Sequence, residues 1–228
     1  MKIIPVIDLK NGVVVHAQQG QRDHYQPIQS SLCQSSNIYQ VIRAFLSLYA
    51  FDVFYIADLD ALTGQGDHDN TINAVLRCYP KIMFWVDQGY RLSSHRTNYL
   101  SNYMPVLGSE SYCENTVMQL KNFKGSFVLS LDYKNNEMLG AKSLFNNSAL
   151  WPNDIIIMTL DQVGNTKGPD FDKLRQFCQQ YPDKNFIAAG GVRDAEDLIS
   201  LQNGGINQAL VASALHSGAL SAADIADF

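Results

Sequence analysis

The stretch NFIAAGGVRDAED, residues 185–197, contains a complete strand-turn-helix unit. Its first residues are apolar enough for a buried strand, Gly190 and Gly191 follow as a turn, and an acidic helix start comes next. Adjacent glycines let the main chain approach a ligand closely, while the free N–H groups and the dipole at a helix start favour an anion. The unit therefore predicts a phosphate-binding turn, although a glycine pair also occurs where a strand and a helix simply pack closely.

The same unit recurs along the chain, because eight short apolar runs alternate with helical patterns. Continuous apolar strands indicate burial on both faces, and eight such units with right-handed crossovers close a barrel. We predict an α/β fold, a (β/α)8 TIM barrel, as one domain over residues 1–228. An open doubly wound sheet is the alternative, but its phosphate loop normally follows the first strand, which here ends in DLKNG without a glycine fingerprint. The predicted strands are residues 3–7, 53–57, 82–86, 104–107, 127–131, 155–158, 186–189 and 209–211, and the predicted helices are residues 38–49, 70–79, 93–101, 114–121, 171–181 and 195–201.

Two segments indicate duplicated half-barrels, at about residues 1–122 and 123–228. Asn11-Gly12 is a hairpin-turn signal after the first strand, and residues 13–18 would return as a small added strand. Residues 134–145 repeat this arrangement after the fifth strand, with Asn135-Asn136 as the turn. The polar stretch 19–36 is then a long loop, either a candidate lid or a disordered segment.

The composition favours a small-molecule partner. A net charge of −5 without runs of Lys or Arg argues against nucleic acid and anionic membranes as partners. No apolar run is long enough for a signal peptide or a membrane span, so we expect a cytoplasmic protein. Cys33, Cys78, Cys113 and Cys178 are far apart, which predicts reduced, buried thiols.

Carboxylates dominate the predicted strand ends, where the active site of a barrel lies. Asp8 ends the first strand and Asp132 the fifth, so they should stand on opposite sides of the barrel mouth, as a two-faced proton transfer requires. Any one of these aspartates, taken singly, equally fits a cap of a turn or helix. The full set at the strand ends is Asp8, Asp58, Asp60, Asp87, Asp132, Thr159, Gly190 and Ser213.

A metal site is the other interpretation of such carboxylates, since oxygen ligands suit magnesium or manganese. In Asp67-His68-Asp69, however, Asp69 or Asn70 is a natural helix cap, and a lone loop histidine is more often solvated than ligating, so we expect no metal. Arg22 is the better candidate in the loop, because a guanidinium can clamp a phosphate or carboxylate with two bonds. His16 in the added hairpin is a further possible substrate contact.

In these motifs the chain resembles the isomerase and cyclase family of histidine biosynthesis, whose members are duplicated (β/α)8 barrels of the ribulose-phosphate-binding type. The resemblance implies that Asp8 and Asp132 act as general base and general acid in an Amadori rearrangement of an aminoaldose to an aminoketose. It implies no cofactor. The matching pieces are IPVIDLKNGVVVH (4–16), ADLD (57–60), LGS (107–109), LSLD (129–132), AGGV (189–192) and LVASAL (210–215).

The same resemblance implies a phosphate group at each end of the substrate. In the C-terminal half, three phosphate-binding residues match the family, namely Gly190, Gly191 and Ser213, while Ala212 replaces a glycine. In the N-terminal half Gly108 and Ser109 match, but the expected triple glycine is Asp87-Gln88-Gly89, followed by Tyr90-Arg91. Asp87 would repel a phosphate unless Arg91 intervenes. Thr159 matches a substrate contact, although the loop after it is shorter than in the family.

These departures leave three functions open. The first is the isomerase acting on a phosphorylated aminosugar or ribonucleotide. The second is a divergent paralogue in one-carbon cofactor metabolism of the methanopterin or methanofuran type, which would act on a monophosphate. Asp87, Gln88 and Arg91 would bind the uncharged or cationic end of this ligand. Residues 163–170 are similar to the corresponding segment of such enzymes. The third is a non-catalytic phosphate-ligand-binding barrel. We expect a phosphorylated small molecule as partner and a monomer or homodimer.

Overall fold

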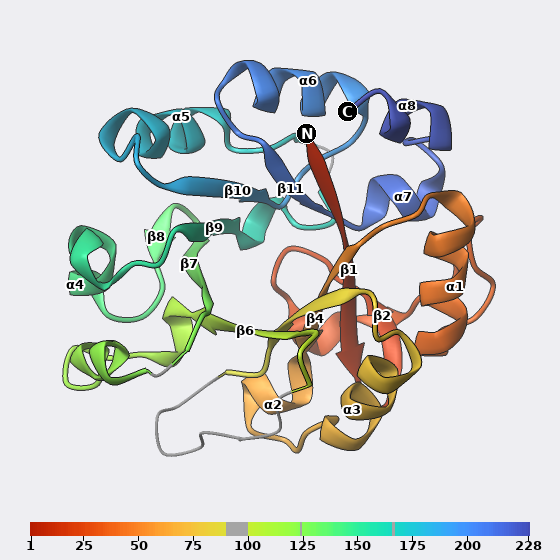
Figure 1. Ribbon diagram of the computed structural model, residues 1–228, viewed down its shortest axis with the longest axis horizontal. Helices are drawn as coiled ribbons and strands as arrows, with labels where there is room; N and C mark the ends of the chain where they lie inside the picture. Colours follow the sequence, from red (N-terminus) through yellow and green to blue (C-terminus); the bar gives the residue numbers. More distant parts are fainter. Residues whose placement is uncertain (90–99, 124, 166) are drawn as a thin grey trace.

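Eight parallel strands form a closed barrel surrounded by helices in the computed structural model, which describes residues 1–89, 100–123, 125–165 and 167–228 (Figure 1). Each strand pairs with the next around the ring, and β11 closes it by pairing in parallel with β1, where Ile4 lies opposite Leu210. All eight predicted strands are confirmed. They are β1 (Lys2–Lys10), β4 (Val53–Asp58), β5 (Met83–Asp87), β6 (Tyr103–Gly108), β7 (Val128–Lys134), β9 (Asp154–Thr159), β10 (Asn185–Ala189) and β11 (Gln208–Val211).

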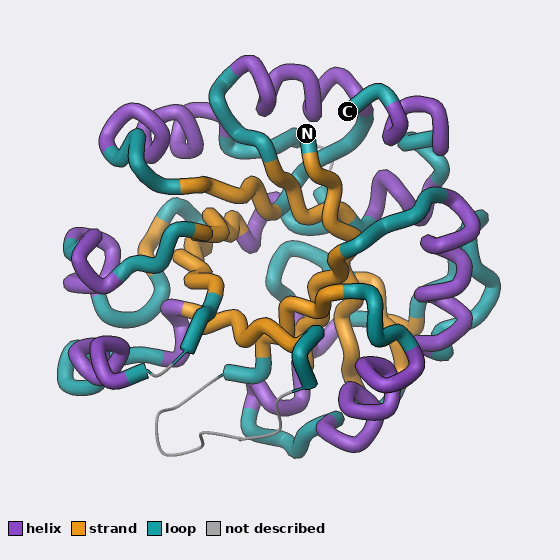
Figure 2. The backbone as a smooth tube through the Cα atoms, in the orientation of Figure 1, coloured by secondary structure: helices purple, strands orange, loops and turns teal. Residues whose placement is uncertain are grey.

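The helices cover the outside of the ring (Figure 2). Apolar side chains fill the layer between these helices and the strands. Four of the six predicted helices are present as α1, α3, α5 and α6. The helix predicted at residues 114–121 is wrong, because this segment contains the 3-10 helix η4, and the one predicted at residues 93–101 lies almost wholly outside the described residues. The α-helices are α1 (Ile38–Leu48), α2 (Leu59–Thr63), α3 (Asp69–Cys78), α4 (Lys142–Asn146), α5 (Phe171–Gln180), α6 (Ala195–Asn203), α7 (Ser213–Ser217) and α8 (Ala222–Ala226), and the 3-10 helices include η1 (Arg22–His24), η3 (Ser109–Ser111), η4 (Val117–Asn122), η5 (Ser148–Leu150) and η6 (Leu160–Gln162).

Both predicted hairpins are present. Asn11 and Gly12 have φ angles of 50° and 78°, and β2 (Val13–His16) returns antiparallel to β1. Asn135 and Asn136 have φ angles of 51° and 62°, and β8 (Glu137–Met138) returns along β7. The stretch 19–36 is partly ordered, because it contains η1 and β3 (Gln26–Pro27), which pairs with β2.

A second apolar cluster fills the inside of the barrel. Alternate residues of each strand point inward, so Ile4, Val53, Tyr55, Trp85 and Ile187 pack together. This packing closes the interior and leaves polar strand ends at the carboxyl edge of the ring.

No helix among the described residues is both long and apolar enough to cross a membrane. The four cysteines are free, but the expectation that all are buried is wrong. Cys33 is buried and Cys178 is partly buried, whereas Cys78 and Cys113 are exposed.

Gly140 offers a test of the turn that supports the barrel edge. Its φ angle is 93°, and a Cβ atom there would lie 2.7 Å from the carbonyl carbon of Ser109 and 2.9 Å from the carbonyl oxygen of Tyr112. We expect Gly140→Ala to lower the free energy of unfolding by about 3 kcal/mol, because backbone strain and a steric clash combine. Gly205→Ala is the matched control: its φ angle is 90°, nothing lies within 4 Å, and strain alone should cost about 1 kcal/mol. Urea unfolding of both variants measures the difference, and equal losses would contradict the prediction.

Candidate active site at the carboxyl end of the barrel

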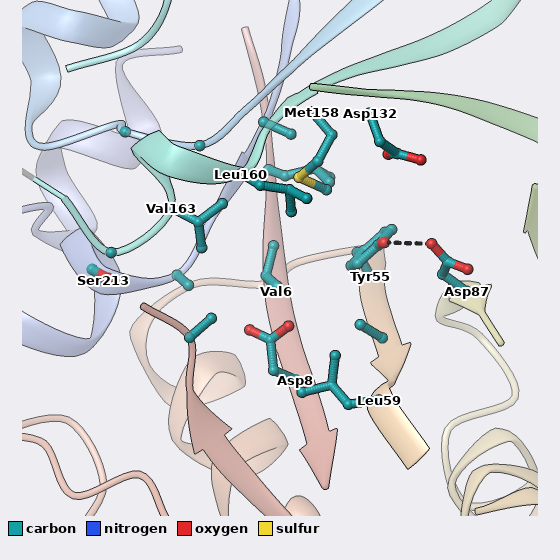
Figure 3. Close-up of a pocket in the computed structure, with 18 of the residues that line it drawn as sticks. Val6, Asp8, Tyr55, Leu59, Asp87, Asp132, Met158, Leu160, Val163 and Ser213 are labelled. Carbon is teal, nitrogen blue, oxygen red and sulfur yellow. Dashed lines mark hydrogen bonds between the residues drawn. The ribbon is translucent and has the colours of Figure 1, made fainter. Parts of the chain in front are cut away.

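A cavity opens at the carboxyl ends of the barrel strands (Figure 3). It encloses about 860 Å³, counting the space that opens to solvent, which is a suitable size for a small molecule. Its walls are mostly apolar, with a few converging polar groups. The polar and charged residues that line it are Asp8, Arg22, Tyr25, Tyr55, Asp87, Glu110, Asp132, Asn165 and Ser213.

Asp8 projects into this cavity from β1 (Figure 3). Its carboxyl group accepts no hydrogen bond from any residue in the described ranges. Burial raises the pKa of Asp8 to about 7, and the positive charge of Arg22 opposes this rise only partly. The carboxyl group can therefore hold or release a proton near neutral pH.

Asp132 enters the cavity from β7 and is held by three donors. The Ser130 hydroxyl donates to Oδ1 at 2.6 Å, and the Ser109 hydroxyl and the Glu110 backbone N–H each donate to Oδ2 at 3.1 Å. Burial and the charge of Glu110 raise the pKa of Asp132 to about 6, and the hydrogen bonds limit that rise. The donors also fix the orientation of the carboxyl group.

Asp87 stands beside Asp132 at the end of β5. Tyr55 donates its hydroxyl proton to Asp87 Oδ2 at 3.1 Å, and the backbone N–H of Gly89 donates to Oδ1 at 3.2 Å. A Cβ atom on Gly108 would lie 3.2 Å from Asp132 Oδ2 and 3.5 Å from Asp87 Oδ2, so this glycine leaves room for both carboxyl groups. Burial and then the charge of Asp132 raise the pKa of Asp87 to about 7.

An ion pair joins two loops at the cavity wall. Arg22 in η1 donates to Glu110 Oε1 in η3 at 2.6 Å, and each side chain is about one-quarter exposed, at 23% and 24%. The backbone carbonyl of Arg22 also accepts a hydrogen bond from Lys10 Nζ at 2.6 Å. Arg22 Nη2 is therefore engaged by Glu110, and binding of a phosphate group by the other N–H groups of the guanidinium stays a prediction.

The glycine pair after β10 forms another part of the cavity wall. Gly190 and Gly191 have φ angles of 101° and 89°, and a Cβ atom on Gly190 would lie 2.6 Å from the carbonyl oxygen of Thr159. Gly191 is buried, yet its backbone N–H has no acceptor in the described part of the chain. A buried N–H without a partner is rare in proteins, so this group is available to a ligand. Ser213 lines the same part of the cavity, and its hydroxyl lies 3.3 Å from His16 Nε2.

The start of α6 does not share in this site. The Asp194 side chain accepts a hydrogen bond from the backbone N–H of Asp197, and the first turn also carries Glu196. These carboxylates neutralise the positive end of the helix dipole. These groups disfavour an anion at this helix start, and binding of a phosphate to its N–H groups stays a prediction.

The structure places the predicted site residues, apart from Arg91, in two groups. Asp8, Arg22, Asp87, Asp132, Gly190, Gly191, Ala212 and Ser213 line the cavity, whereas His16, Asp58, Gly108, Ser109 and Thr159 lie outside its lining, and Arg91 lies outside the described residues. Ser109 is fully buried, and its hydroxyl both donates to the Asp132 carboxylate and accepts from the Asp132 backbone N–H at 2.9 Å. This geometry leaves the hydroxyl committed to Asp132. Sequence reasoning missed Tyr25, Tyr55, Glu110 and Asn165.

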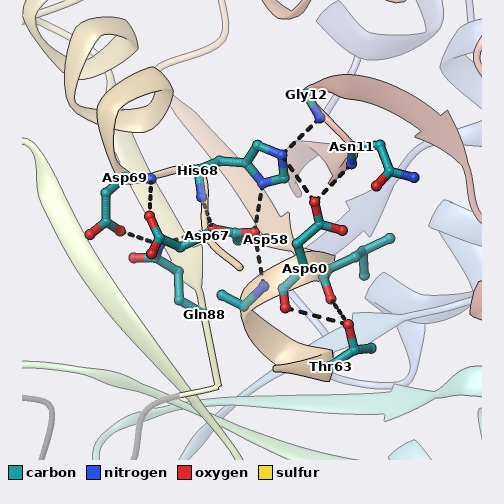
Figure 4. A network of polar contacts seen from close by, with 11 residues as sticks. Asn11, Gly12, Asp58, Asp60, Thr63, Asp67, His68, Asp69 and Gln88 are labelled. Carbon is teal, nitrogen blue, oxygen red and sulfur yellow. Dashed lines mark hydrogen bonds and ion pairs between the residues drawn. The ribbon is translucent and has the colours of Figure 1, made fainter. Parts of the chain in front are cut away.

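Asp58 and His68 belong to a polar network beside the cavity (Figure 4). His68 Nδ1 lies 2.8 Å from Asp58 Oδ1, and the backbone N–H of Gly12 donates to Nε2 at 2.8 Å. The expectation of a solvated histidine is therefore wrong: only 9% of its side chain is exposed, and the network ties the first hairpin to α3. His68 also precedes α3 as its N-cap, so neither Asp69 nor Asn70 has that role. Within the described ranges, no group of three His, Cys, Asp or Glu residues has a metal-binding arrangement.

Ser130→Ala tests how the hydrogen bond from Ser130 affects the pKa of Asp132. The hydrogen bond from Ser130 stabilises the ionised form of Asp132, and the variant lacks it. We therefore expect Ser130→Ala to raise the pKa of Asp132 further above about 6. Carbon-13 NMR of the Asp132 carboxyl carbon as a function of pH measures the change. Ser126→Ala, at an exposed position, is the control and should leave the titration unaltered. An unchanged Asp132 titration in Ser130→Ala would refute the assignment.

Comparison with known proteins gives consistent full-length matches. The family described as histidine biosynthesis protein matches residues 2–221 of this chain. An uncharacterized protein of Methanocaldococcus jannaschii is 30% identical over 227 residues, which cover 99% of this chain and 97% of that protein. A protein of Ruminiclostridium cellulolyticum, named 1-(5-phosphoribosyl)-5-((5-phosphoribosylamino)methylideneamino) imidazole-4-carboxamide isomerase, is 24% identical and covers 96% of this chain and 95% of its own length. A protein of the same name from Listeria innocua is 26% identical, with coverage of 100% and 98%.

Proposed function

This chain belongs to the family of histidine biosynthesis proteins, and on that premise we propose that it is an acid–base isomerase of a phosphorylated aminosugar or ribonucleotide. The observation that carries the proposal is the presence of Asp8 and Asp132 in one cavity. They belong to β1 and β7, which are not neighbours in the ring. A substrate between them can lose a proton to one carboxyl group and gain a proton from the other.

The hydrogen bonds support Asp132 as the base and Asp8 as the acid. Three donors stabilise the ionised form of Asp132, whereas no described residue donates to Asp8. Burial raises the pKa of both groups, and the hydrogen bonds to Asp132 oppose the rise there, so we place the shared proton on Asp8. This assignment reverses the roles that the family resemblance implies.

The proposed reaction is an Amadori rearrangement. The Gly191 N–H group and the Ser213 hydroxyl hold the phosphoryl group, while Asp8 protonates the ring oxygen of an aminoaldose and the ring opens to an iminium ion. Asp132 then removes the proton from C2, which gives an enaminol. Asp132 exchanges the proton it has taken with solvent and protonates C1, while Asp8, ionised in the first step, takes the C2 hydroxyl proton, which completes the aminoketose and restores both residues. The reaction opens the ring and transfers hydrogen internally from C2 to C1, so it needs no external oxidant or reductant.

Proton exchange with solvent tests this function whatever side group the sugar carries. The protein is incubated in D2O with a panel of phosphorylated aminoaldoses, including the imidazole-carboxamide compound that the relatives' name specifies. NMR should detect an aminoketose with deuterium at C1. Conversion of no member of the panel, together with no exchange at C2, would count against the proposal.

We also propose that the barrel consists of two related halves. The hairpins formed by β1 with β2 and by β7 with β8 begin at equivalent places, four parallel strands apart in the ring. Asp8 and Asp132 hold the matching positions on the first strand of each half. A duplicated scaffold accounts for two carboxyl groups of the same type facing one ligand.

A further inference from the structure

The cavity is acidic at the end away from Ser213. Asp87 and Asp132 lie at this end, while Ser213 lies at the other (Figure 3). Arg22 is the one basic side chain among the described lining residues, and it is paired with Glu110. The titratable residues that face the cavity are Asp8, Arg22, Tyr25, Tyr55, Asp87, Glu110 and Asp132.

The carboxyl groups at this end form no ion pair with a basic side chain in the described part of the chain. This holds for Asp87 and Asp132, and also for Asp8. The described hydrogen-bond donors to Asp87 and Asp132 are neutral: Asp87, for example, accepts from the Tyr55 hydroxyl and the Gly89 N–H. Burying carboxylates without counter-charges is costly, so a cationic ligand would stabilise this site.

We infer that the substrate carries a phosphate at one end and a protonated amine at the other. Asp87 and its neighbour Asp132 hold the ammonium group. This inference rests on the proposed phosphate grip at Gly191 and Ser213. A second phosphate at the acidic end would face two carboxyl groups, which repel a dianion. The name of the relatives contains two phosphoribosyl groups, so this chain would act on a different class of compound.

An ammonium group bound between Asp87 and Asp132 would also favour proton transfer to Asp132. Its charge favours the ionised form of the neighbouring carboxyl groups, so it would lower the pKa of Asp132 from about 6 and keep this residue ready as the base. Binding of an amine should therefore release protons from Asp87 and Asp132. An uncharged ligand of the same size should release fewer protons.

Calorimetry with three matched series of probes tests the inference. The first series is aminoalkyl phosphates with two to six carbons, the second replaces the amine by a hydroxyl group, and the third replaces it by a second phosphate. Near neutral pH we expect the best amine to bind about tenfold or more tightly than its hydroxyl analogue, and the bisphosphate to bind worst. Titrations in buffers of different ionisation enthalpy should show proton release with the amine.

Asp87→Asn gives the decisive comparison. It should remove the advantage of the amine over the hydroxyl analogue, whereas Asp161→Asn, whose side chain accepts from the backbone N–H of Asn135 at 3.1 Å outside the cavity lining, should retain it. Equal binding of amine and hydroxyl analogues to the unaltered protein, or tightest binding of the bisphosphate, would overturn the inference alone. Failure of every phosphate to bind would instead overturn the phosphate grip and the proposed function with it. Proton release from the unaltered protein keeps the test valid if Asp87→Asn does not fold.

Discussion

Replacing Asp132 by asparagine is expected to lower turnover about 10²- to 10⁴-fold, the usual contribution of a positioned acid or base. Asparagine keeps the size of the side chain and the acceptor oxygen for Ser130, but it cannot take up the C2 proton. Asp8→Asn should cause a loss of the same order, because the ring oxygen then lacks a proton donor. Solvent-deuterium uptake into the aminoketose measures both variants.

The pH profiles of the two variants should differ in a way that identifies each role. In the unaltered protein, activity should rise as Asp132 loses its proton near pH 6 and fall as Asp8 loses its proton near pH 7. Residual activity in Asp132→Asn should lack the rise, and in Asp8→Asn it should lack the fall. Asp161→Asn is the control at the same end of the barrel and should keep both limbs. If the two variants lose the opposite limbs, Asp8 is the base.

The barrel itself was predictable because each strand is buried on both faces. Such strands appear in the sequence as short continuous apolar runs, and their carboxyl ends meet at one edge of the ring. The positions of Asp8 and Asp132 at the cavity followed from this rule alone. The short helix η4 was not predictable in the same way, because Val117 and Leu120, its two buried residues, lie three positions apart and fit either an α-helix or a 3-10 helix.

Long-range contacts account for most of what the sequence did not reveal. Only 9% of the His68 side chain is exposed, and its ring contacts Asp58, ten residues earlier, and Gly12, 56 residues away. Glu110 meets Arg22 across 88 residues of chain, and no local pattern marks either as a partner of the other. Tyr55 alone had a usable signal, since alternation along β4 places it on the inner face with Val53 and Ala57.

Ser213→Asp should weaken binding of phosphate-bearing ligands by a large factor. Two unit charges 4 Å apart interact by about 4 kcal/mol at an effective dielectric constant of 20, so a carboxylate beside the phosphoryl group should raise KM about 10²- to 10³-fold. The value of kcat should change little, because Ser213 lies at the far end of the cavity from Asp132 (Figure 3).

Ser213→Asn separates charge from size, since asparagine has nearly the same volume as aspartate and no charge. We expect it to raise KM by less than about tenfold, because it loses one hydrogen bond but adds no repulsion. Steady-state kinetics at two ionic strengths complete the comparison: only the aspartate variant should recover partly when salt screens the repulsion. Equal losses in both variants would mean that the added bulk is responsible, and a phosphoryl group could then not be assigned to this end of the cavity. A loss confined to the charged variant would support the assignment. The proposed donors, the Gly191 N–H and the Ser213 hydroxyl, are neutral, so one added negative charge is enough to outweigh their attraction for the phosphoryl group.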